Sequence, residues 1–143
     1  MTSTKQSDKL VTVKDQEVFK LVSDIGEDLR TSVRDGAFSR LEWYRDRLDR
    51  LTGAYMYLSD KYRRTKVARA NNEVAEYVGI RSTWNEGKFV SAVAERQARN
   101  AIASWAEAEH VFEGYLEAAN QGILTLKKSL EIEVIDKQIE AKK

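Results

Sequence analysis

The apolar residues of the chain recur at intervals of three and four positions, the spacing that places side chains on one face of an α-helix. Near the N-terminus this spacing is followed by Val18, Leu21, Val22, Ile25 and Leu29. It predicts a helix over about 13–33, and Gly36 is expected to break it because glycine tolerates the conformations that end helices. Residues 1–12 are expected to form a flexible lead-in.

A longer run of the same pattern predicts a second helix over about 37–78. Its heptad seam consists of Leu41, Tyr44, Leu48, Leu51, Tyr55, Leu58, Tyr62 and Thr65. After Tyr62 the apolar positions move to Val67, Ala70, Val74 and Tyr77, which predicts a local change of phase. Gly79 is expected to cap this helix, and Gly87 provides a second flexible point in the loop that follows.

A third helix is predicted over about 88–138. Its seam consists of Ala98, Ala101, Trp105, Ala108, Phe112, Tyr115, Ala119, Ile123, Leu126, Leu130 and Val134. A short loop between two long helices favours an antiparallel hairpin. If the hairpin folds about residue 83, two residues whose numbers add up to about 166 would lie opposite each other. Small residues at Ala94, Ala98, Ala101, Ser104 and Ala108 would let the helices approach closely near the tip.

These patterns predict an all-α protein, a long coiled-coil-like antiparallel hairpin with a shorter N-terminal helix, in which residues 13–143 form one helical domain. The absence of proline among 143 residues agrees with long helices, because proline breaks them. Long apolar seams on a thin hairpin leave exposed area, so we expect a homo-oligomer. The polar N-terminus has no signal-peptide core and no apolar run spans a bilayer, so we expect a soluble cytoplasmic protein, in a host cytoplasm if phage-encoded.

The composition restricts the chemistry. The chain has no cysteine, which removes disulfides, thiolate metal sites and thiol nucleophiles. Glu107 and His110 have the Glu-x-x-His spacing of di-iron bundles, but His110 is the single histidine and such a site needs a second copy of the motif. No catalytic triad, phosphate-cradling loop or zinc spacing occurs. We therefore expect neither an enzyme nor a cofactor.

Charge is segregated although the 24 cations and 23 acids nearly balance. Residues 61–99 contain nine cations against four carboxylates, a net charge of +5. In the predicted hairpin, 63–69 would face 97–103, which brings Arg96 and Arg99 to the same end. Trp84, flanked by Tyr77 and Phe89, lies in the loop. Cations beside aromatic rings are what single-strand binding requires.

The candidate nucleic-acid-binding residues are Arg63, Arg64, Lys66, Arg69, Arg81, Trp84 and Lys88. The alternative interpretation is a solvated cationic face on which Trp84 caps the hydrophobic end of the hairpin. Away from this end, Glu107, Glu109, Glu113 and Glu117 are expected to lie beside Arg45, Arg47 and Arg50 and to form interhelical ion pairs.

The segment "RRTKVARANNEVAEYVG" resembles the basic stretch and aromatic-glycine break of phage recombination-mediator (UvsY-like) proteins. Lys66 and Arg69 would match the basic pair, and Tyr77 and Gly79 would match the aromatic-glycine break. The spacing from the basic pair to the break is longer here than in that family. The resemblance covers about 40–135. It implies an oligomeric hub that binds single-stranded DNA, contacts a single-strand-binding protein and helps to load a recombinase, with phosphate contacts from Arg63, Arg64, Lys66 and Arg69.

Two other functions fit the same sequence. The first is a helical structural or adaptor protein whose hairpin binds other protein helices. The second is an inhibitor or regulator that docks on a partner through the same basic tip.

Overall fold

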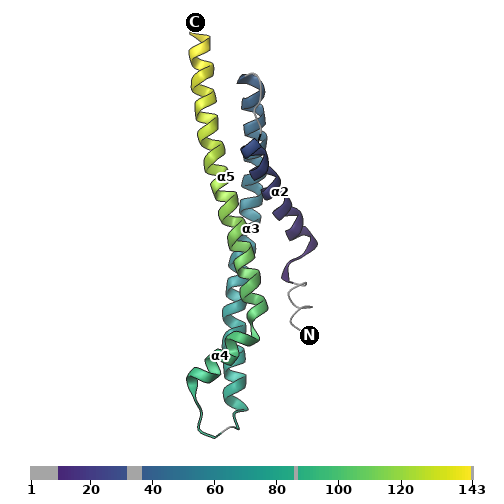
Figure 1. Cartoon of the computed structure of the whole chain (residues 1–143), viewed down its shortest axis with the longest axis vertical. Coiled ribbons are helices and arrows are strands. Elements are labelled where there is room, and N and C mark those ends of the chain that lie inside the picture. The colour runs from purple at the N-terminus through teal and green to yellow at the C-terminus, as the bar shows by residue number, and fades with distance from the viewer. Residues whose placement is uncertain (1–9, 32–36, 86, 143) are drawn as a thin grey trace. The chain divides into compact units, whose positions relative to one another are not determined.

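The computed structural model describes residues 10–31, 37–85 and 87–142. These residues include four helices: α2 (Val13–Thr31), α3 (Ala37–Ser82), α4 (Ser91–Ala101) and α5 (Ala103–Ala141) (Figure 1). The two long helices, α3 and α5, pack antiparallel, and α2 is the shorter N-terminal helix. The predicted all-α antiparallel architecture is confirmed. Gly36, the expected break after α2, lies outside the described residues. Within the described ranges, none of the helices carries an apolar stretch long enough to cross a bilayer.

The chain divides into two compact units. Of the described residues, unit 1 comprises 10–12, 60–85 and 87–113, and unit 2 comprises 13–31, 37–59 and 114–142. Unit 1 holds the C-terminal part of α3, the loop, α4 and the start of α5. Unit 2 holds α2, the N-terminal part of α3 and the rest of α5. The candidate nucleic-acid-binding residues all belong to unit 1.

Several side-chain contacts hold α2 within unit 2, and two of them involve aromatic residues. The ring of Phe19 stacks on that of Tyr115 with centroids 4.2 Å apart and planes 9° from parallel. The hydroxyl of Tyr57 donates a hydrogen bond of 2.6 Å to Oδ1 of Asp15, a carboxylate that is fully buried. A buried charge is costly unless it is hydrogen-bonded. The Tyr57 hydroxyl therefore fixes the position of α2 on α3.

Gly122 is a point of close approach between α3 and α5 in unit 2. A Cβ atom at Gly122 would lie 2.5 Å from Cδ2 of Leu51, which is 1% exposed. The absence of a side chain at this position lets Leu51 pack directly on the α5 backbone. The predicted seam residues Leu51, Leu58, Ala119 and Leu126 are all buried.

Ion pairs in unit 2 differ from those expected. Nε of Arg40 donates a 2.7 Å hydrogen bond to Oε1 of Glu133, and this bond raises the pKa of Arg40. Arg47 contacts Asp46 at 2.8 Å and Asp28 at 3.7 Å. The expected pairing of Arg47 with acids of 107–117 is therefore wrong. The cause is the register of the hairpin.

The predicted helix over 88–138 is interrupted at Ile102, so that prediction is wrong. The Ile102 N–H lies 3.3 Å from the carbonyls of both Ala98 and Arg99, and α5 begins at the next residue. Ile102 and Ser104 are 4% and 7% exposed. Residues two apart point about 200° apart on a continuous helix of 3.6 residues per turn. The break allows both side chains to be buried.

Helix α3 ends later than expected, and the register along the hairpin differs from the predicted one. Helix α3 continues past Gly79 to Ser82, and Thr83 donates its N–H and its hydroxyl to the Gly79 carbonyl. Among described residues, positive φ occurs only at Gly87, at 81°. Folding about residue 83 would place Arg69 opposite residue 97, but Arg69 contacts Glu109. The hairpin is therefore shifted by twelve residues at this point.

Of the positions to which the apolar pattern on α3 was predicted to move, Tyr77 is half-buried, whereas Val67, Ala70 and Val74 are exposed. Thr65 is 8% exposed, and Ala68, Arg69, Asn72 and Glu73 are half-buried, so the original seam continues. Val67 and Val74, expected on the buried side, are 55% and 63% exposed. The helix in unit 1 therefore buries polar groups and presents valines outward.

Candidate nucleic-acid interface

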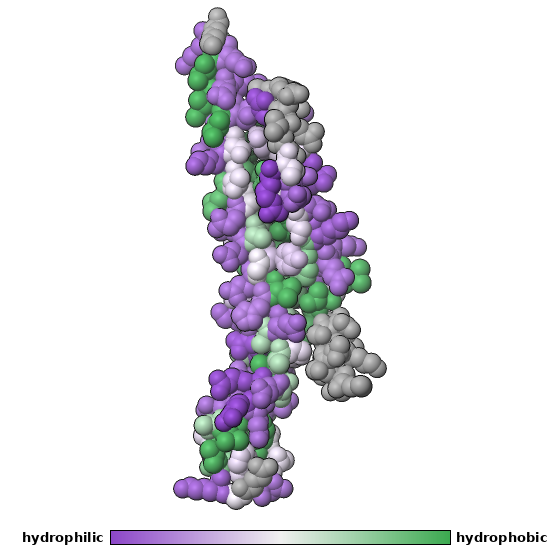
Figure 2. Space-filling view, in the orientation of Figure 1, coloured by the Kyte–Doolittle hydropathy of each residue, from purple (hydrophilic) through white to green (hydrophobic). Residues whose placement is uncertain are grey.

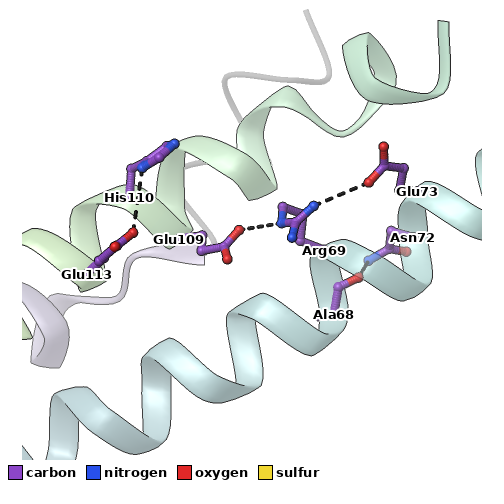
Figure 3. A network of polar contacts seen from close by, with 7 residues as sticks. All are labelled: Ala68, Arg69, Asn72, Glu73, Glu109, His110 and Glu113. Atoms are coloured by element: carbon purple, nitrogen blue, oxygen red, sulfur yellow. Dashed lines mark hydrogen bonds and ion pairs between the residues drawn. The ribbon is translucent and has the colours of Figure 1, made fainter. Parts of the chain in front are cut away.

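Arg69 is engaged in ion pairs within unit 1. Its Nε donates a hydrogen bond to Oε2 of Glu109 on α5, and its Nη1 lies 3.3 Å from Oε2 of Glu73 (Figure 3). The Arg69 and Glu109 side chains are 26% and 13% exposed. A guanidinium held by two carboxylates on a half-buried surface has little capacity left for a phosphate. We assign Arg69 a role in joining α3 to α5.

Arg63 and Arg64 share one acidic partner. Their guanidinium groups lie 3.1 and 3.0 Å from the two carboxylate oxygens of Asp60. The arginine side chains are 77% and 74% exposed. Exposed pairs of this kind contribute about 0–1 kcal/mol. A phosphate could replace Asp60 at small cost, and Arg63 and Arg64 remain candidates.

Lys66, Arg81 and Lys88 are exposed and make no ion pair with any described residue. The ammonium of Lys66 lies 5.8 Å from the centre of the Tyr62 ring, and the Arg81 guanidinium lies 5.6 Å from that of Phe89. Lys66 and Arg81 are fifteen residues apart on α3, about 22 Å at 1.5 Å per residue. Their cations extend along the helix and do not converge on one point.

The loop aromatics pack against each other. Phe89 meets Trp84 edge to face at 5.3 Å and Tyr77 at 6.2 Å. Trp84 is half-buried, and its indole N–H is buried without a hydrogen-bond partner among the described residues. The sequence predicted that Tyr77 and Phe89 flank Trp84, and Phe89 contacts both. This packing favours the interpretation of Trp84 as a cap on the end of the hairpin.

Arg96 and Arg99 on α4 were not among the candidate binding residues. Both are exposed and neither pairs with a described carboxylate. They were expected to face 63–69; Ala98 of α4 lines the same groove as Arg69, and Glu109 of α5 pairs with Arg69. Their outward position could have been inferred from the buried Ala94 and Ala98, which define the opposite face of α4.

Acidic residues limit where a nucleic acid could lie. Residues 61–99 carry +5, but inclusion of Asp60, Glu107, Glu109 and Glu113 reduces the charge over 60–113 to +1. A groove of about 430 Å³ in unit 1 is lined partly by Glu73 and Glu95. Its carboxylates would repel a phosphate. The available cationic surface is thus the outer side of α4, the loop and the exposed side of α3.

The described residues contain no group of three or more His, Cys, Asp or Glu placed to hold a metal ion. The side chain of His110 lies 3.8 Å from Glu113 and is 83% exposed (Figure 3). The chemistry available to the exposed cations is non-covalent attraction of anions.

Comparisons of the chain with models of protein families, with curated proteins and with solved structures found no match.

Proposed function

We propose that the protein binds single-stranded nucleic acid through the cations of unit 1 and acts as an accessory protein in DNA recombination. One observation carries the binding proposal: five exposed cations of unit 1 form no ion pair with any described residue. They are Lys66, Arg81, Lys88, Arg96 and Arg99. Cations without carboxylate partners can neutralise phosphates without first losing an existing pair.

Phosphate contact is the dominant interaction in this proposal. The cations are spread along α3, the loop and α4, which suits an extended backbone better than a compact base-reading pocket. Because Trp84 and Phe89 pack on each other, they offer limited stacking area to bases. Binding should therefore depend little on sequence and strongly on salt.

The recombination role is supported by the resemblance of residues 40–135 to UvsY-like mediators. Such a protein would organise a single strand in cooperation with a recombinase and a single-strand-binding protein, and it would catalyse no bond change. Lys66 and Arg69 match the basic pair of those proteins, but Arg69 is already held in ion pairs with Glu73 and Glu109. Lys66 is the member of that pair available to phosphate.

A salt titration tests the binding proposal. Fluorescence anisotropy of a labelled oligothymidylate would be measured at several salt concentrations for the unmodified chain and for Lys66→Gln with Lys88→Gln. For single strands the slope of log K against log salt is about −0.7 per neutralised phosphate. Loss of two contacts should reduce the magnitude of the slope by about 1.4.

The matched control is Lys127→Gln with Lys128→Gln, two exposed lysines of α5 in unit 2. It removes the same charge and leaves unit 1 unchanged. Equal loss of affinity in both variants would show non-specific attraction to total charge and refute the assignment. Absence of binding by the unmodified chain at low salt would refute the function itself.

A helical assembly protein is the second candidate function. It is favoured by the large hydrophobic side chains that stay more than half exposed on α3 and α5, including Val74 and Ile135. Exposed apolar stripes of this kind are typical of surfaces that pack on another helix. A variant that no longer binds nucleic acid but still binds a protein partner would favour this function.

A further inference from the structure

Two apolar surfaces lie on the outer sides of the long helices. The valine ridge consists of Val67, Val74 and Val78 on α3 in unit 1, which are 55%, 63% and 54% exposed. Spacings of seven and four residues place these side chains on one face, and that face points away from the buried Thr65.

The second surface, the isoleucine stripe, consists of Ile132, Ile135 and Ile139 on α5 in unit 2, which are 52%, 54% and 52% exposed. It lies opposite the buried Leu126 and Glu133. Figure 2 shows hydrophobic side chains along the C-terminal part of α5, at the upper left.

The two surfaces carry opposite charge. Arg69 pairs with Glu73 and Glu109 on the α5 side, so the charges around the valine ridge are Arg63, Arg64, Lys66 and Arg81 against Asp60 and Glu76, a net charge of +2. Glu133 is buried on the other side of α5 and pairs with Arg40, so the charges around the isoleucine stripe within residues 131–140 are Glu131, Asp136 and Glu140 against Lys137, a net charge of −2. Arg81 is beside the ridge in the helical projection, whereas Glu131 and Asp136 flank the stripe.

We propose that the valine ridge of one chain binds the isoleucine stripe of a second copy. Val67 and Val74 are seven residues apart, as are Ile132 and Ile139, so both surfaces have the heptad spacing of helices that pack side by side. The Arg81 guanidinium would meet a carboxylate at the edge of this contact. A ridge against a ridge, or a stripe against a stripe, would bring like charges together.

The interface is heterologous, because each copy uses one surface to bind and offers a different one to the next copy. Contacts of this kind form a ring when the rotation closes and a filament when it does not. The proposal does not depend on nucleic-acid binding, because its apolar residues are not among the proposed phosphate contacts. Arg81 is the one cation that both proposals use, and the variants below leave it unchanged.

A mixing experiment tests the heterologous geometry. The ridge variant is Val67→Gln with Val74→Gln, and the stripe variant is Ile132→Gln with Ile139→Gln. Glutamine favours helix and adds no charge. Size-exclusion chromatography with light scattering should give an assembly above the 16.4 kDa chain mass for the unmodified protein and 16.4 kDa for each variant alone.

An equimolar mixture of the two variants should recover a species of twice the chain mass and nothing larger. The intact stripe of one variant then binds the intact ridge of the other, and no second interface remains. Met56→Gln, which changes another exposed apolar residue of α3, is the control and should assemble normally. Circular dichroism must show equal helix content in all variants.

Three results would overturn the proposal. The first is an unmodified chain that is monomeric at 100 micromolar. The second is a ridge variant that keeps the full assembly, which would indicate stripe-to-stripe pairing. The third is a mixture of two helical variants that stays at the mass of one chain. Unchanged oligonucleotide affinity in a dissociated variant would leave the nucleic-acid proposal standing, so the two proposals fail separately.

Discussion

Gly122→Ala tests the close approach of α3 and α5 in unit 2. Alanine is a better helix former than glycine by about 0.8–1.0 kcal/mol in a helix interior. At Gly122 this gain is opposed by a Cβ atom 2.5 Å from Cδ2 of Leu51. Leu51 is 1% exposed, so neighbouring side chains enclose it, and overpacking of this kind costs about 1–3 kcal/mol.

The net effect expected for Gly122→Ala is therefore destabilisation by about 0–2 kcal/mol. A Cβ atom at Gly114 in the same helix, or at Gly53 in α3, would meet no atom within 4 Å. Gly114→Ala and Gly53→Ala should therefore each stabilise the protein by up to about 1 kcal/mol. Urea unfolding followed by circular dichroism gives the free energy of unfolding of each variant.

The difference between Gly114→Ala and Gly122→Ala isolates the contact, because both substitutions change the same helix in the same way. We expect it to be about 1–3 kcal/mol. Leu51→Ala in the Gly122→Ala background should remove most of the clash penalty, measured as a coupling in a double-mutant cycle. Equal stabilities of the two alanine variants would refute the close approach.

Three further substitutions probe named contacts by the same unfolding assay. Tyr57→Phe should cost about 1–3 kcal/mol, because a buried oxygen of Asp15 loses the hydrogen bond from Tyr57, and an unchanged stability would contradict that bond. Phe112→Ala should cost about 3–5 kcal/mol because Phe112 is fully buried, and a cost below about 1 kcal/mol would exclude a core position. Trp84→Phe should be neutral or stabilising, because it removes a buried N–H that lacks a partner among the described residues, and a loss above about 1 kcal/mol would reveal a hidden partner.

Hydrophobic spacing predicted the long helices because it reports local geometry directly. Leu51 and Leu58 were placed correctly on the buried side of α3, and Ala119 and Leu126 on that of α5. The break at Ile102 has no such signal. Neither proline nor glycine occurs near it, and the cause is the burial of two residues that a continuous helix would point in different directions.

The candidate site was harder to predict because it depends on long-range register. The sequence identifies the cations, but the ion pair of Arg69 with Glu109 exists only with the observed alignment of the hairpin. That alignment depends on where α3 ends and on the turn at Gly87, and Gly79 gave a misleading earlier stop. The expected register holds at the tip, where Tyr77 contacts Phe89, but the expected cross-helix partners of Arg69 and Arg47 were wrong.

The break at Ile102 also has a dynamic consequence. Helix α4 has eleven residues, and isolated helices shorter than about 12–15 residues are marginal in water. Separated from α5, α4 depends on the burial of Ala94 and Ala98 for its stability. Its amides should exchange with solvent faster than those around Phe112, because α4 can open locally while α5 stays folded. The cations Arg96 and Arg99 would then sit on a segment that adjusts to a partner without disturbing the long helices.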